Sequence, residues 1–89
     1  MAELTLYHLE TCPYCRRVRA AADHLGIELN LVDVAEVPGA RQRLIDQLGR
    51  GTVPVLGISD GKNEHLLPES LEIIKWLEAH ADTYARGAA

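Results

Sequence analysis

Both cysteines of the chain lie in one tetrad, Cys12-Pro13-Tyr14-Cys15. Two thiols at this spacing can reduce a disulfide, because one sulfur attacks as a thiolate and the other resolves the mixed disulfide. A structural zinc site needs about four ligands, whereas the pair supplies two and the four histidines show no spacing that completes the set. Two inert buried thiols are the other alternative, and it is disfavoured because the surrounding residues place the pair at a helix start.

The residues around the tetrad predict a strand followed by a helix. Leu4 to Leu9 reads as a strand, with both of its faces largely apolar. Pro13 suits the first position of a helix, where its missing N–H costs nothing. Apolar residues at helical spacing follow, and Gly26 ends the helix as a left-handed cap. Cys12 is therefore predicted at the N-cap, beside unpaired backbone N–H groups and the positive end of the helix dipole.

This position predicts different roles for the two sulfurs. A helix N-terminus within a Cys-x-x-Cys motif can lower a thiol pKa from about 8.5 to about 3.5–7.5, so Cys12 is the predicted attacking sulfur. Cys15 lies one turn inside the helix and is predicted to be less exposed, with a normal or raised pKa. Arg16 either adds positive potential or belongs to a solvated helix face, and Glu10 opposes thiolate formation.

The rest of the chain predicts three more strands and two more helices. The strands are expected over 28–34, 53–58 and 63–67, and the helices over 40–48 and from Pro68 onward. Asp60-Gly61 between two apolar stretches predicts a hairpin. The last helix is expected to pack Leu71, Ile74 and Leu77 inward, with Trp76 as a further candidate. The order β-α-β-α-β-β-α predicts an α/β fold with a four-stranded mixed sheet and three flanking helices, the first two strands being parallel.

Composition limits the size and the partners of the protein. The 89 residues predict a single domain over 1–89, with a core over about 4–81 and a frayed tail over 82–89. The 13 Leu, 6 Val and 5 Ile argue against disorder. A net charge of −4 with no Phe disfavours nucleic acid as a partner. No apolar run approaches the roughly 20 residues of a membrane span, and the first residues lack signal-peptide features, so we expect a cytoplasmic monomer without a membrane partner.

The tetrad after the first strand and Thr52-Val53-Pro54 before the third resemble the glutaredoxins of the thioredoxin-like fold, from about Leu4 to about Ala81. In that family the proline matching Pro54 is cis and packs beside the active cysteine; from the residues alone, Pro54 simply opens a strand. The resemblance implies that glutathione lies across Cys12, with its cysteinyl backbone paired to the main chain at Val53.

The resemblance also implies where the rest of glutathione binds. The γ-glutamyl end is expected at the start of the last helix, where N–H groups attract a carboxylate, Ser70 donates and Glu69 accepts from the amine. Ordinary helix capping is the alternative for these two residues. The full set of implied glutathione contacts is Tyr14, Arg41, Val53, Pro54, Glu69 and Ser70.

The chain departs from typical glutaredoxins in two places. Leu9 stands where they carry a Lys, which removes one partner of the glycyl carboxylate. Arg41 matches another position that binds the glycyl carboxylate in this family, and Arg50 is a less certain candidate for the same contact. Either arginine could instead be a solvated surface charge. Pro68-Glu69-Ser70 replaces a Gly-Gly segment and looks like the N-terminal domain of glutathione transferases. A whole transferase is not expected, because 89 residues leave no room for its all-helical second domain.

The function that the resemblance implies is a glutathione-dependent thiol–disulfide oxidoreductase. Cys12 would be the nucleophile, Cys15 the resolving thiol, and glutathione the co-substrate, with no metal. Glutathionylated or disulfide-containing proteins are the expected substrates, and glutathione reductase the indirect electron source. Two alternatives stay open: a redoxin reduced by thioredoxin reductase, and a binding module in which two Cys12 thiolates and two glutathiones hold a [2Fe–2S] cluster. Pro13 and the second cysteine disfavour the cluster.

Overall fold

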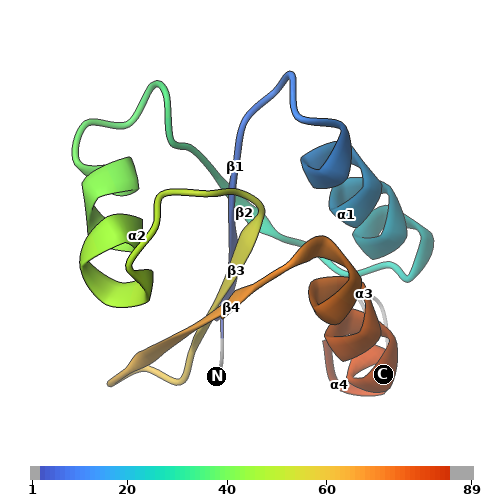
Figure 1. The fold of residues 1–89 in the computed structure, drawn as a ribbon. Helices are drawn as coiled ribbons and strands as arrows, with labels where there is room; N and C mark the ends of the chain where they lie inside the picture. Colours follow the sequence, from blue (N-terminus) through green and yellow to red (C-terminus); the bar gives the residue numbers. More distant parts are fainter. Residues whose placement is uncertain (1–2, 85–89) are drawn as a thin grey trace.

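Four strands and four helices make up the computed structural model, which describes residues 3–84 (Figure 1). In chain order they are β1 (Glu3–His8), α1 (Pro13–His24), β2 (Asn30–Asp33), α2 (Ala40–Leu48), β3 (Val55–Ser59), β4 (Glu64–Pro68), α3 (Ser70–Ala79) and α4 (Ala81–Tyr84). The predicted order is confirmed, and α4 adds a fourth, short helix. Within residues 3–84, no helix is both long enough and apolar enough to cross a membrane.

The four strands form one mixed sheet in the order β2-β1-β3-β4. β1 and β2 are parallel, whereas β3 runs antiparallel to both β1 and β4. The predicted hairpin joins β3 to β4: Asp60 Oδ1 accepts from the N–H groups of Lys62 at 3.1 Å and Asn63 at 2.9 Å. Gly61 takes a φ of +96°, which a residue with a side chain adopts only with strain.

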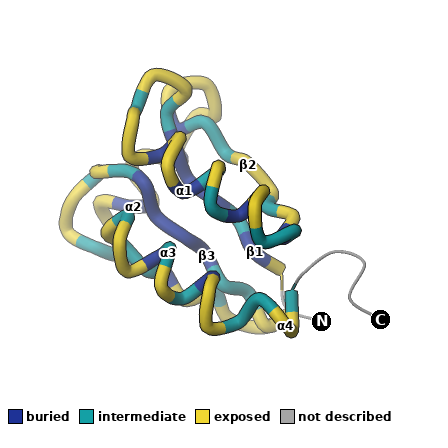
Figure 2. Tube along the Cα trace, turned by 90° about the vertical axis from the view of Figure 1, so that its right-hand side faces the viewer, coloured by how far each residue is buried: buried dark blue, intermediate teal, exposed yellow. Residues whose placement is uncertain are grey.

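Helices cover both faces of the sheet, as predicted. On one face α1 and α3 pack over Leu4, Leu6 and Leu56, and on the other α2 packs over Tyr7 and Val55. The alternation of side chains along β1 therefore supplies both cores. Figure 2 shows the result, with β1 and β3 buried and the outer helix surfaces exposed.

A polar cluster fastens α2 to the second face. The Tyr7 hydroxyl accepts from Arg43 Nη1 at 2.6 Å and donates to the Glu64 carboxylate, whose oxygens lie at 3.1 Å. Arg43 Nη2 also pairs with Glu64 Oε1. One tyrosine thus links β1, α2 and β4.

The buried face of α3 differs from the predicted one. Leu71 is 63% exposed, whereas Ile73 and Leu77 are fully buried and Ile74 and Trp76 are partly buried. Residues six apart are about 120° apart around a helix, and residues four apart only about 40°. A stripe through Leu71 and Leu77 is therefore too wide for the surface that α1 and the sheet offer, and the pair Ile73 and Leu77 fills it instead.

This assignment predicts that a small deletion inside the core of α3 outweighs a larger one outside it. We expect Ile73→Val to lower the free energy of unfolding by about 0.5–1.5 kcal/mol. The exposed control, Leu71→Ala, removes more atoms and should change it by no more than about 0.5 kcal/mol. Urea unfolding followed by circular dichroism measures both, and the reverse ranking would show that the face is misassigned.

The sequence predicted a frayed tail from residue 82, and the structure assigns residues 82–84 of it to a helix. They belong to α4, where the N–H groups of Thr83 and Tyr84 donate to the His80 carbonyl at 3.0 and 3.1 Å. The Trp76 ring stacks on His80 at a centroid distance of 4.0 Å and meets Tyr84 at 5.4 Å. Aromatic packing therefore orders this turn. The remainder of the predicted tail, 85–89, lies outside the described residues.

Candidate active site

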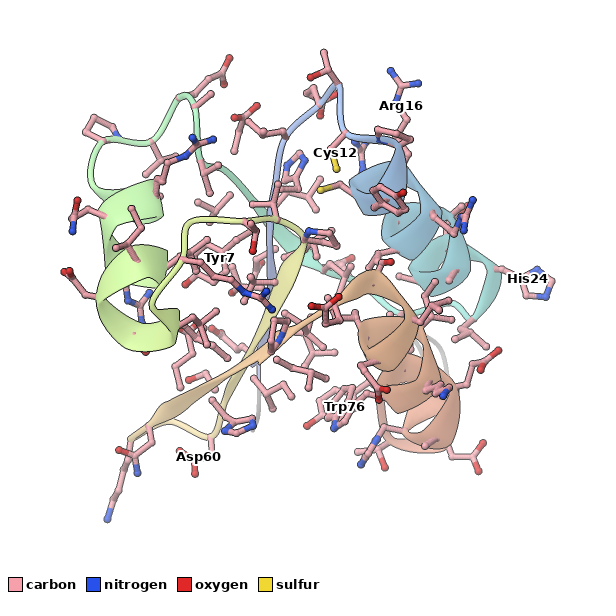
Figure 3. The ribbon with its side chains drawn as sticks, in the orientation of Figure 1. Tyr7, Cys12, Arg16, His24, Asp60 and Trp76 are labelled. Carbon is pink, nitrogen blue, oxygen red and sulfur yellow. The ribbon has the colours of Figure 1, made fainter. Side chains whose placement is uncertain are left out.

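Cys12 occupies the N-cap of α1, as predicted. Its backbone is extended, with φ −82° and ψ 117°, and Pro13 follows at the first helical position. The Cys12 N–H donates to the Leu9 carbonyl at 3.1 Å, which closes the turn between β1 and the helix. No side chain caps α1, so its first-turn N–H groups and positive dipole end lie beside this partly exposed sulfur (Figure 3).

Cys15 lies one turn further and has no exposed surface. Burial raises the pKa of the Cys15 thiol to about 11; a hydrogen bond with the Cys12 thiol acts in the same direction, and one from the Leu9 N–H opposes both. The two sulfurs are therefore in contact as free thiols with different surroundings. The raised value agrees with the normal or raised pKa that the sequence predicted for the second cysteine.

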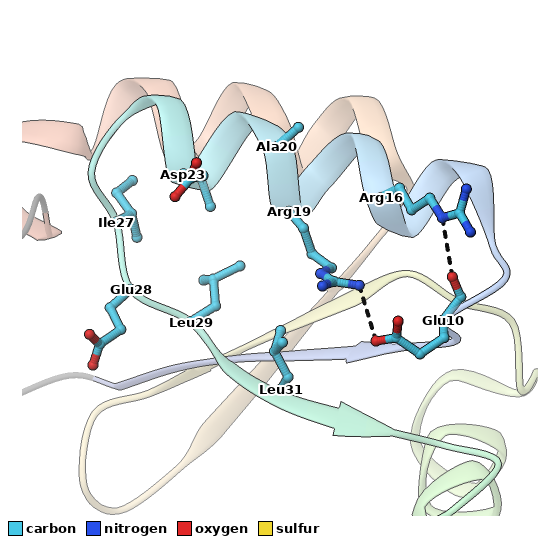
Figure 4. A pocket seen from close by; sticks show the side chains of 10 residues that line it. Glu10, Arg16, Arg19, Ala20, Asp23, Ile27, Glu28, Leu29 and Leu31 are labelled. Atoms are coloured by element: carbon cyan, nitrogen blue, oxygen red, sulfur yellow. Dashed lines mark hydrogen bonds and ion pairs between the residues drawn. The ribbon is translucent and has the colours of Figure 1, made fainter.

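The charges next to the tetrad are paired with one another. Arg19 Nη1 contacts Glu10 Oε1 at 3.2 Å, and Arg16 Nε donates to the Glu10 carbonyl at 3.2 Å (Figure 4). The carboxylate that was expected to oppose thiolate formation is thus offset by Arg19. These residues line a hollow of about 600 Å³ between α1 and β2, and neither cysteine is among its lining residues.

A second hollow, of about 610 Å³, gathers most of the predicted glutathione contacts. The beginning of α1, the loop before β3 and the first turn of α3 enclose it. Its lining residues are Tyr14, Arg17, Arg50, Thr52, Val53, Pro54, Glu69, Ser70, Leu71 and Glu72. Cys12 is not one of them, but it precedes the lining residue Tyr14 by two positions.

The loop before β3 has the backbone that the resemblance implied. The Val53–Pro54 peptide bond is cis. Sheet pairing of β3 begins only at Val55, so the peptide groups of Val53 are not part of the ladder. Arg41 lies outside the hollow: it is exposed on α2 with its side chain against Gly51, where an added Cβ would come within 2.9 Å of Arg41 Cγ.

Glu69 is the residue before α3, and its backbone is unusual. Its φ of +77° lies in the region that favours glycine, a conformation that costs free energy and is found most often at functional sites. The Glu69 side chain makes no capping hydrogen bond and instead pairs with Arg50 Nη2 at 2.8 Å. Ordinary capping therefore does not describe Glu69, and the first-turn N–H groups of α3 have no side-chain cap.

The hollow also contains charged residues that the sequence did not single out, Arg17 and Glu72. Arg17 follows Tyr14 by three positions in α1, and Glu72 lies in the first turn of α3, three positions after Glu69. Helical spacing of three brings side chains to one face, so the pattern in α1 could have identified Arg17. With Arg50 and Glu69, the hollow presents two positive and two negative charges.

Known proteins match the chain in both sequence and fold. The profile of the family "Glutathione S-transferase, N-terminal domain" matches residues 6–85. The chain belongs to this family. Glutaredoxin 3 of Escherichia coli K12 is 34% identical over 58 residues, which are 65% of this chain and 70% of that protein. The resemblance to glutaredoxins and to the transferase N-terminal domain is thereby confirmed.

Two solved glutaredoxins share the thioredoxin-like fold. Reduced glutaredoxin C1 from Populus tremula x tremuloides superimposes with a TM-score of 0.73 at 20% identity, over 97% of this chain and 80% of that one. Buckwheat glutaredoxin, solved as a glutathione complex, gives a TM-score of 0.56 at 24% identity, over 62% of this chain and 53% of that one. This chain thus spans about half the length of the buckwheat protein.

Proposed function

We propose that the chain is a glutathione-dependent thiol–disulfide oxidoreductase. The observation that carries the proposal is the pairing of a partly exposed thiol at the N-terminus of α1 with a buried second thiol, next to a hollow of balanced charge. Family membership and the similarity to glutaredoxin 3 support glutathione-related thiol chemistry. Among residues 3–84, no three His, Cys, Asp or Glu side chains form a group able to hold a metal ion.

With a glutathionylated substrate, Cys12 alone performs the exchange. Its thiolate attacks the glutathione sulfur in line with the disulfide bond, the substrate thiolate leaves, and Cys12 retains the glutathione as a mixed disulfide. A second glutathione then attacks that disulfide and leaves as oxidised glutathione. The net change is a thiol–disulfide exchange: the substrate sulfur is reduced to a thiol, the incoming glutathione is oxidised, and the glutathione that the substrate carried stays in a disulfide.

With a protein disulfide, both cysteines take part. Cys12 attacks one substrate sulfur and the second substrate sulfur leaves as a thiolate. Cys15 then attacks Cys12, which releases the substrate as a dithiol and leaves a Cys12–Cys15 disulfide for glutathione to reduce. The contact between the two thiols supports this step. A reduction potential of about −200 to −230 mV is typical of such proteins.

The second hollow is the proposed glutathione site. Glutathione carries carboxylates at both ends and one ammonium group, so it needs charges of both signs. The uncapped start of α3 suits the γ-glutamyl carboxylate, Glu69 suits the ammonium group, and the peptide groups of Val53 suit strand-like pairing with the cysteinyl residue. Arg50, inside the hollow, is better placed than Arg41 for the glycyl carboxylate.

The electron source tests this function directly. We expect NADPH oxidation with glutathione, glutathione reductase and a small glutathionyl disulfide, because the hollow selects glutathione as reductant. With thioredoxin reductase in place of glutathione and its reductase, we expect background turnover. Turnover only with thioredoxin reductase would replace the proposal by the redoxin alternative. If neither reductase supports turnover and the anaerobically purified protein absorbs visible light, the cluster-binding module would be favoured.

A further inference from the structure

The edge of the sheet at β2 carries an apolar side chain that no helix covers. Leu31 pairs in register with Leu6 of β1, which lies in the core under α1 and α3, so Leu31 points to the same face of the sheet. It is nevertheless 48% exposed, whereas Leu6 has no exposed surface. β2 is an outer strand of the sheet, and within residues 3–84 no strand pairs with its far side. The layer of helices therefore ends before the sheet does.

The uncovered strip belongs to the hollow of about 600 Å³ between α1 and β2. Its apolar lining includes Ile27, Leu29 and Leu31, which follow one another along the chain that leads into β2 (Figure 4). Apolar side chains gathered in a hollow are typical of interaction surfaces. The hollow proposed for glutathione shares none of these lining residues. The surface is therefore one that the proposed function does not use.

The helical wall of this hollow is one stripe of α1. Arg16, Arg19, Ala20 and Asp23 line it, and residues three and four apart lie on one face of a helix. Ala20 is exposed in the middle of the stripe. Because the distance between packed helices depends on the side chains at their contact, this alanine allows a second helix to approach α1 closely.

Charge is distributed unevenly along the hollow. At the end near the start of α1, the Glu10 carboxylate pairs with Arg19 at 3.2 Å, while Arg16 contacts the Glu10 main-chain carbonyl. Asp23 and Glu28 lie at the other end (Figure 4). The first end is therefore positive and the second negative. A surface with opposite charges at its two ends is complementary to a copy of itself that is turned by 180°.

We propose that the chain forms a twofold-symmetric dimer in which this hollow packs against the same hollow of a second copy. With the twofold axis between Arg19 and Ala20, the two α1 helices run antiparallel, and Arg16 of each copy lies opposite Asp23 of the other. Leu31 of each copy is buried beneath the paired helices. Each contact occurs twice, as twofold symmetry requires. This assembly differs from the monomer expected from the sequence.

The dimer leaves the proposed glutathione site open. Tyr14 and Arg17 line that site from α1, whereas the dimer uses the stripe of Arg16 and Asp23 on the same helix. The inference therefore does not rest on the proposed function. A monomeric protein could still perform the thiol chemistry, and an inactive protein could still dimerise.

Sedimentation velocity under reducing conditions tests the association, and the reductant excludes dimers linked by a disulfide. Chain concentrations from about 1 μM to about 1 mM cover weak to moderate dissociation constants. We expect a reversible equilibrium between monomer and dimer, because the surface is small. The dimer should weaken as salt is raised, since the contacts between Arg16 and Asp23 are exposed to screening.

Leu31→Glu tests the apolar part of the interface. It should lower the association constant at least about 100-fold, because the dimer would bury two unpaired carboxylates. Leu71→Glu is the matched control, since it makes the same substitution at another exposed leucine that lies outside this hollow. The control should stay within about threefold of the wild-type association constant. Circular dichroism checks that both variants fold.

A charge exchange tests the antiparallel arrangement. Arg16→Glu and Asp23→Arg should each lower the association constant at least about tenfold, because both symmetric contacts become repulsive. An equimolar mixture of the two variants should regain association, since one contact of the mixed dimer is the original pair and the other is its reverse. The double variant should also regain it. Its net charge equals that of the wild type, so the double variant separates a specific contact from an effect of net charge.

Two results would overturn the dimer at this surface. One is a single monomeric species at all concentrations up to about 1 mM. The other is a dimer that Leu31→Glu and the single charge variants leave intact, because the copies would then meet through another surface. Association that neither the mixture nor the double variant regains would contradict the antiparallel arrangement. Should Leu31→Glu not fold, the charge variants still decide, because Arg16 and Asp23 are exposed on the helix.

Discussion

Replacing Cys12 with serine is expected to abolish reduction of both glutathionyl and protein disulfides, whereas Cys15→Ser is expected to retain reduction of glutathionyl disulfides. The reason is that Cys12 is the partly exposed thiol at the uncapped start of α1, while Cys15 is fully buried. Serine at position 12 offers no thiolate, and the buried sulfur cannot reach a large substrate in its place. Initial rates of NADPH oxidation with glutathione reductase measure the first activity, and reduction of a disulfide-bonded protein measures the second.

The two serine variants are controls for each other, because each removes one sulfur from the same helix turn. Cys15→Ser should turn over a glutathionyl substrate at a rate on the order of the wild-type rate, since glutathione itself resolves the mixed disulfide. It should lose the protein-disulfide activity, for which an internal second thiol is needed. Retained turnover by Cys12→Ser would overturn the assignment of the nucleophile and transfer it to Cys15.

The fold could be predicted from the sequence wherever local chemistry decided the structure. Pro13 and Gly26 mark the limits of α1, and Asp60-Gly61 marks the hairpin. Proline fixes its own φ, whereas Gly26 and Gly61 adopt the positive φ values that end a helix or close a turn. The buried face of α3 could not be predicted in the same way. Leu71 and Leu77 both fit a helical stripe, and only the surface offered by α1 and β3 selects Ile73 in place of Leu71.

The site shows the same division between local and long-range information. The tetrad and the Thr52-Val53-Pro54 segment were recognisable because their chemistry lies in adjacent residues. The pair of Arg50 with Glu69 joins residues 19 positions apart, and no spacing rule predicts such a contact between a loop and a helix start.

Glu69→Gln is expected to raise the KM for glutathione by about 10–100-fold with little change in kcat, since a hydrogen bond to a charged group contributes about 1.5–3 kcal/mol. The carboxylate of Glu69, now paired with Arg50 at 2.8 Å, is the proposed acceptor for the glutathione ammonium group, and glutamine keeps its length but not its charge. The exposed ion pair itself contributes at most about 1 kcal/mol to folding, so thermal unfolding should barely change.

Glu72→Gln is the matched control, because it makes the same substitution one turn further along α3 in the same hollow. Glu72 has no proposed contact with glutathione, so its KM should stay within about threefold of the wild-type value, a difference of roughly 0.6 kcal/mol. Equal increases in the two variants would show that the hollow responds only to its net charge, and an unchanged KM in Glu69→Gln would remove Glu69 from the glutathione site. A selective effect at Glu69 would explain why this residue keeps a strained backbone. With a φ of +77°, its carboxylate makes no capping hydrogen bond. The N–H groups of the helix are then free for the anion of the ligand, and the carboxylate accepts its cation.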